Sequence, residues 1–124
     1  MSKRRFAAGL IAAVITVAAL ATVLVGSTTA APKAKFLAAL ISDTGRFTDK
    51  SFNQSQLEGL KRAKKKLGIN ILPLESKSSS DYTPNFITAQ QRGANIIIAA
   101  GFLLAPDLKK IADQFPNSRY AITD

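Results

Sequence analysis

Four short apolar runs alternate with three amphipathic stretches along the chain, and this alternation predicts the fold. The apolar runs are continuous, as expected for strands covered on both faces, and they span 36–42, 69–75, 95–101 and 119–123. The amphipathic stretches predict helices over 51–67, 84–92 and within 102–115. A β-α-β-α-β-α-β order places the chain in the α/β class, with a doubly wound parallel sheet, right-handed crossovers and helices on both faces.

Capping residues and prolines set the expected boundaries of these elements. Ser51, followed three residues later by Gln54, fits a capping box at the start of the first helix. Thr83 is expected to cap a second helix that begins at Pro84, the favoured first helical residue. Pro73 cannot donate to a sheet ladder, so its strand is expected at an edge of the sheet.

The first thirty residues are not expected to belong to the fold. A basic start is followed by the uncharged run 6–26 and then by the small residues of "STTAA", which is the order of a secretory signal peptide. We expect cleavage after Ala30, which leaves 31–124 as the folded part. The alternative is an uncleaved membrane anchor, since the run is about long enough to span a bilayer. Either way, the chain is expected to be periplasmic or associated with the cell surface.

The predicted domain ends abruptly. A fourth strand with no helix after it leaves apolar surface uncovered, and it places Asp124 at the carboxyl end of that strand. We therefore expect 31–124 to be a partial N-terminal lobe, truncated after its fourth strand.

Composition removes several classes of chemistry. The chain has no cysteine and no histidine, so disulfides, a lipid-modified cysteine, zinc sites and Ser-His or Cys-His nucleophiles are not expected. Neither a GxGxxG nor a GxxxxGK[ST] motif is present, and no pair of carboxylates is placed for acid–base work. The sequence therefore predicts a protein that is not an enzyme and that has no metal and no cofactor.

The formal net charge of +9 raises the question of an anionic partner. The densest basic cluster is "KRAKKK", residues 61–66, on a predicted helix whose other face is apolar. A solvated helix face, with lysine stems over apolar surface, is the favoured interpretation. A patch for nucleic acid or lipid headgroups is the alternative, and no nucleic-acid partner is predicted.

The loop after the first strand carries the first candidate ligand site, because ligands of open parallel sheets bind beyond the carboxyl ends of the strands. Asp43 can accept hydrogen bonds, Phe52 offers a ring face, and Asn53 offers both a donor and an acceptor. Each has a structural alternative: Asp43 can satisfy loop amides, Phe52 can be core, and Asn53 can be an ordinary polar residue of the first helical turn.

The end of the third strand is the second candidate. Gly101 permits close backbone approach, and Phe102 follows it at the same rim. The rings of Phe102 and Phe52 could stack on both sides of a planar ligand. The alternative is that Phe102 covers the third helix.

These residues lead to a family. The segments "SDTGRFTDKSFNQSQLEGLKRA", "SDYTPNF" and "GFLLAPDLKKIADQFPNSRYAITD" resemble the basic membrane protein family, and the likeness covers 36–124. Its members are extracytoplasmic substrate-binding proteins of ABC transporters, and purine nucleoside receptors are the best understood. The resemblance implies a periplasmic-binding-protein-like lobe of a clamshell, with Asp43, Phe52 and Asn53 facing the cleft. The resemblance also implies that Phe102 belongs to the binding site.

The resemblance also implies a function and a partner. The chain is expected to bind a nucleoside-like solute and deliver it to an ABC permease at the membrane. A membrane-anchored ligand sensor, an enzyme that acts on nucleosides and a non-functional truncated remnant are the alternatives. Two departures from the family pattern are the missing lipobox cysteine and the missing second lobe.

Overall fold

The computed structural model describes residues 35–124, so the predicted signal peptide lies outside the described residues. Within these residues four strands and three α-helices alternate, with a 3-10 helix before α2 and another before α3. The bounds are β1 Leu37–Thr44, α1 Phe52–Leu67, β2 Asn70–Ser76, η1 Ser79–Asp81, α2 Tyr82–Gln91, β3 Ile96–Ala100, η2 Phe102–Leu104, α3 Ala105–Gln114 and β4 Tyr120–Thr123. The predicted α/β class and the order of the elements are confirmed.

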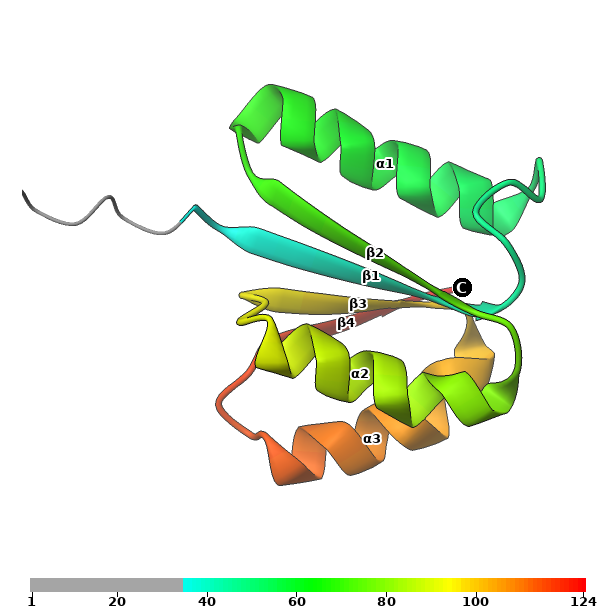
Figure 1. Ribbon diagram of the computed structural model, residues 1–124, viewed down its shortest axis with the longest axis vertical. Helices are drawn as coiled ribbons and strands as arrows, with labels where there is room; N and C mark the ends of the chain where they lie inside the picture. The colour runs from blue at the N-terminus through cyan, green and yellow to red at the C-terminus, as the bar shows by residue number, and fades with distance from the viewer. Residues whose placement is uncertain (1–34) are drawn as a thin grey trace, which may run out of the picture. The chain divides into compact units, whose positions relative to one another are not determined.

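The four strands form one parallel sheet in the order β2-β1-β3-β4. Figure 1 shows α1 on one face of this sheet and α2 with α3 on the other. β2 is an edge strand, as Pro73 predicts. Because the chain leaves β1 toward β2 on one side and returns to β3 on the other, the strand order reverses between β1 and β3.

Alternate residues of the central strands enter two separate cores. Ala39 and Ile41 face α2 and α3, where they meet Phe86 and Ile111, and all four are at most 1% exposed. The neighbouring residues of β1 face α1 and join a smaller cluster, formed by Ala38, Leu40, Phe47, Leu60 and Ala100. β1 is therefore buried on both faces, which explains its unbroken apolar sequence.

The predicted cap of α1 is wrong in detail. The Ser51 side chain makes no capping hydrogen bond. Asp49 takes this role: its carboxylate accepts the N–H groups of Ser51 at 2.8 Å, Asn53 at 3.2 Å and Gln54 at 3.2 Å. A carboxylate reaches further than a serine hydroxyl and interacts favourably with the positive end of the helix.

The predicted start of the second helix is also wrong. α2 begins at Tyr82, directly after η1, so Thr83 and Pro84 both lie inside its first turn. The Thr83 hydroxyl donates to Asp107 Oδ1 at 2.6 Å, which links the beginnings of α2 and α3. The helix ends where expected, with Gly93 in the left-handed region after it.

No helix within residues 35–124 combines the length and the apolar character needed to cross a bilayer.

Candidate functional site at the carboxyl rim

The carboxyl ends of β1 and β3 meet at the point where the strand order reverses, which is where sheets of this class bind ligands. We call the edge of the sheet where the strands end and the helices begin the carboxyl rim. Asp43 lies near the end of β1, and Gly101 directly follows β3. The predicted site residues thus include one from β1, two from the start of α1 and one from η2.

Asp43 lies directly against Gly101. A Cβ atom added to Gly101 would collide with the carboxylate of Asp43, and the φ of 111° at Gly101 also disfavours any other residue. The Gly101 N–H donates to Thr123 O at 2.8 Å, so the same residue ties β3 to the end of β4. The close backbone approach predicted at Gly101 is therefore present, and a carboxylate fills it.

Asn53 is held beside Asp43 on the other side. Its Nδ2 donates to Asp43 Oδ1 at 3.3 Å, and a Cβ atom at Gly45 would collide with that same nitrogen. The Asn53 side chain is 5% exposed, yet its Oδ1 has no hydrogen-bond partner. Buried polar atoms are normally paired, because an unpaired one costs about 1–3 kcal/mol. The rim therefore presents one buried acceptor, Asn53 Oδ1, beside a carboxylate.

The two predicted rings differ in their surroundings. Phe52 is half-buried and packs against the smaller core cluster beneath α1. Phe102 is 62% exposed, so it does not serve mainly to cover α3. Phe102 is thus the more available of the two rings for stacking, whereas Phe52 contributes to the core.

Two further side chains, which the sequence pattern did not indicate, hold the carboxyl rim in place. The Ser42 hydroxyl, fully buried, donates to Gly45 O at 3.2 Å and accepts the Ser76 N–H at 3.0 Å. The Tyr82 hydroxyl lies 2.8 Å from Thr44 Oγ1 and accepts the Thr44 N–H at 3.0 Å. A serine at the end of an otherwise apolar strand was the available signal for Ser42. Tyr82 carried no local signal, because its partner is 38 residues away.

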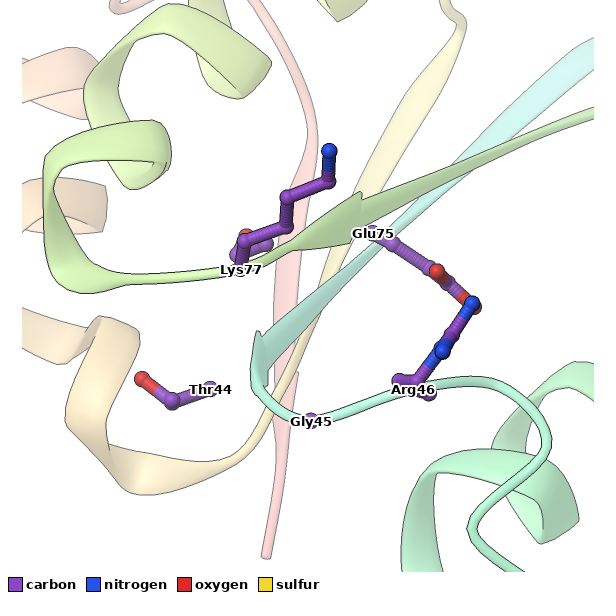
Figure 2. Close-up of a pocket in the computed structure, with 6 residues that line it drawn as sticks. Thr44, Gly45, Arg46, Glu75 and Lys77 are labelled. Carbon is purple, nitrogen blue, oxygen red and sulfur yellow. The ribbon is translucent and has the colours of Figure 1, made fainter.

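A groove of about 460 Å³ adjoins these residues at the ends of β1 and β2, and its lining residues are Thr44, Gly45, Arg46, Glu75, Ser76 and Lys77. None of the four predicted site residues lines it. Figure 2 shows Arg46 and Glu75 directed toward one another and Lys77 directed away from both. Glu75 Oε1 accepts the Phe47 N–H at 2.7 Å, so this carboxylate has a structural task. No group of three or more His, Cys, Asp or Glu side chains within residues 35–124 could hold a metal ion.

Comparison with known proteins decides the family. The profile of the Bmp family, described as ABC transporter substrate-binding protein PnrA-like, matches residues 36–124. The chain belongs to this family. The predicted resemblance is thereby confirmed, and with it the assignment to the substrate-binding proteins of ABC transporters.

Individual relatives agree with this assignment. The ABC transporter nucleoside-binding protein BmpA of Lactococcus lactis is 35% identical over 96 residues, which cover 74% of this chain and 27% of BmpA. An uncharacterized lipoprotein of Pyrococcus abyssi is 33% identical, over 80% of this chain and 25% of the relative. The chain therefore spans about a quarter of the length of these relatives.

A solved structure shows the same fold. The solute-binding protein of an ABC transporter system from Aeropyrum pernix K1 superimposes with a TM-score of 0.64 at 25% identity. The match covers 70% of this chain and 24% of that protein. Substrate-binding proteins and lipoproteins work at or outside the cytoplasmic membrane, so these relatives support an extracytoplasmic or surface location.

Proposed function

We propose that the carboxyl rim forms one wall of a nucleoside site, from which the solute is delivered to an ABC permease. The observation that carries the proposal is the unpaired Oδ1 of Asn53, buried beside Asp43 at the crevice between β1 and β3. Family membership supports solute binding, and the name of the BmpA relative supports a nucleoside.

The rim favours a ligand with hydrogen-bond donors. Asn53 uses its Nδ2 on Asp43, which leaves Oδ1 as the group it can offer a ligand. A carboxylate such as that of Asp43 only accepts hydrogen bonds when ionised. Acceptors side by side suit the N–H groups of a base or the hydroxyls of a ribose, both of which a nucleoside carries.

Phe102 is proposed to add affinity by stacking. Its exposed ring follows Gly101, whose backbone touches the Asp43 carboxylate. Stacking of a base on an aromatic ring contributes about 1–3 kcal/mol. We assign Phe52 a smaller part in binding, because its ring is already packed against the core.

The test is a calorimetric titration with a panel of purine and pyrimidine nucleosides. Because the chain spans about a quarter of BmpA, the titrated protein is a chimera in which residues 36–124 replace the corresponding part of BmpA. We expect saturable binding of at least one nucleoside, weakened by about 1–3 kcal/mol in Phe102→Ala. Asn53→Leu should abolish nucleoside binding, because the acceptor Oδ1 is removed.

The controls separate binding from folding. Phe102→Ala should leave the free energy of unfolding within about 0.5 kcal/mol, since the ring is exposed. Phe52→Ala should reduce stability more than affinity. Flat titrations for every nucleoside, in a chimera whose circular dichroism matches that of BmpA, would overturn the proposal.

A further inference from the structure

Charge is segregated between the two ends of the sheet. We call the edge where the strands begin and the helices end the amino rim. Six of the eight acidic residues of the chain lie at the carboxyl rim: Asp43, Asp49, Glu75, Asp81, Asp107 and Asp124. Six basic residues lie at the amino rim: Lys35, Lys64, Lys65, Lys66, Arg92 and Arg119. Figure 1 shows that the end of α1 and the start of β1 lie at the same side of the fold.

The basic residues of the amino rim are not neutralised. The one acidic residue there, Asp113, pairs with Lys109 at 2.7 Å, and this is the only ion pair among residues 35–124. Lys64, Lys65 and Lys66 form consecutive positions of the last turn of α1, and all three are exposed. The amino rim therefore offers a positive surface to whatever approaches it.

Apolar side chains lie within this positive surface. Leu67 is 72% exposed and Phe36 is 45% exposed. Leu67 is the last residue of α1, and Phe36 lies beside the start of β2 three residues further on, because the Asn70 N–H donates to Phe36 O at 2.8 Å. Exposed apolar groups ringed by lysines are typical of surfaces that lie at the boundary between lipid headgroups and acyl chains.

The helix dipole explains only part of this arrangement. Cations near the carboxyl ends of helices are stabilised by the dipole, which accounts for the lysines of α1 and for Arg92 after α2. Lys35 and Arg119 precede strands and do not belong to the last turn of any helix. The dipole also gives no reason for the exposure of Leu67.

The path of the sequence favours a membrane over other anionic partners. Eight residues, 27–34, separate the uncharged run 6–26 from Lys35, and an extended linker of that length reaches at most about 30 Å. While that run is attached and held in a bilayer, Lys35 of the amino rim cannot be further than this from the lipid surface. We propose that the amino rim binds the surface of a bilayer rich in anionic lipid, with the carboxyl rim directed away from it.

The expected strength follows from the number of cations. Each lysine near an anionic bilayer strengthens binding about fivefold, so Lys64, Lys65 and Lys66 together contribute roughly 100-fold. The attraction is electrostatic and should weaken as salt shortens the screening length. It does not depend on the ligand at the carboxyl rim.

Lysine acetylation, read by mass spectrometry, tests the proposal on the full chain. The chain is incorporated into vesicles of phosphatidylcholine, with or without 30 mol% phosphatidylglycerol (about a third of the lipid, chosen to give a clear surface potential). We expect Lys64, Lys65 and Lys66 to react several-fold more slowly on the anionic vesicles and to recover in 0.5 M salt, about a 4 Å screening length. Lys50 and Lys77, at the carboxyl rim, are the internal control and should react equally on both.

A variant sharpens the test. In the triple variant Lys64→Gln, Lys65→Gln, Lys66→Gln, the protection of Lys35 on anionic vesicles should fall to its phosphatidylcholine level. The matched variant Lys50→Gln, Lys77→Gln should keep that protection. Equal reaction rates on both vesicles would overturn the proposal, as would single-stranded RNA that protects the same lysines as strongly as anionic vesicles do.

Discussion

The two ends of one sheet are built in opposite ways. At the carboxyl rim, Asp43 and Asn53 fill the space beside glycines, and a hydrogen bond joins their side chains. At the amino rim, Gly68 and Gly93 end α1 and α2, and a Cβ atom added to either would meet nothing within 4 Å. The difference fits the two proposed tasks: a rim proposed to bind a small solute needs crowded, fixed groups, whereas a rim proposed to meet a bilayer needs only charge and exposure.

The largest expected effect comes from alanine substitution of one glycine at each rim. Gly101→Ala should cost about 3 kcal/mol or more, since its φ of 111° is strained and Asp43 occupies the space. Gly68→Ala should cost only about 1 kcal/mol, because a φ of 65° lies in the left-handed helical region and the surroundings are open. Urea denaturation measures both.

A second substitution identifies the cause of the difference. In an Asp43→Gly background, the carboxylate that blocks position 101 is gone. The cost of Gly101→Ala should then fall toward that of Gly68→Ala, leaving only the strain of the backbone. Equal costs at both glycines in the original background would show that the carboxyl rim is no more crowded than the amino rim.

The next largest loss of stability is expected at the two ends of β1. At each end, the side chain of a distant residue accepts a backbone N–H of the strand. Tyr82 accepts from Thr44 at 3.0 Å and is 2% exposed, whereas Asn95 accepts from Leu37 at 2.7 Å and is exposed. Tyr82→Phe should cost about 1–3 kcal/mol, because the N–H loses its partner inside the protein. Asn95→Ala should cost about 0.5–1 kcal/mol, because water replaces the amide.

Thermal unfolding with matched buffers would rank these two variants. Hydrogen exchange at Thr44 and at Leu37 would show whether each loss is local. If Asn95→Ala cost more than Tyr82→Phe, the carboxyl rim would not be the more rigid end of the strand.

The fold could be predicted because its signals are local in sequence. Continuous apolar runs indicated the strands, and Gly68 and Pro73 marked a helix end and an edge strand as observed. The placement of Asp43 near the strand end followed from topology alone. What these signals could not supply were contacts between distant residues, such as the hydroxyl of Tyr82 on Thr44.

The candidate site, too, could be predicted only in part. Asp43 and Asn53 were selected from sequence, and the structure brings them within hydrogen-bond distance. The groove beside them was missed, since Arg46 and Lys77 belong to separate loops that come together only in the folded chain. Whether the four selected residues bind a ligand stays a prediction until the nucleoside titration.

The smallest expected effect tests the corrected cap of α1. Desolvation acts to raise the pKa of Asp49, but hydrogen bonds from the N–H groups of Ser51, Gln54 and Asn53 outweigh it, so this pKa lies below its ordinary value of 3.8. A carboxyl group with a lowered folded-state pKa stabilises the fold at pH above its unfolded value, and this contribution is lost as the pH falls through the folded value. Asp49→Asn should therefore lower the melting temperature at pH 7, and this loss should shrink as the pH falls below 3.8 and through the lowered folded-state pKa.

Ser51→Ala is the matched control for that variant. Its side chain makes no capping hydrogen bond, so the melting temperature should change little at either pH. If Ser51→Ala were the more damaging of the two at pH 7, the cap would belong to the serine after all. The start of α1 would then be fixed by the residue that the sequence pattern selects, and Asn53 would owe its position beside Asp43 to a different contact.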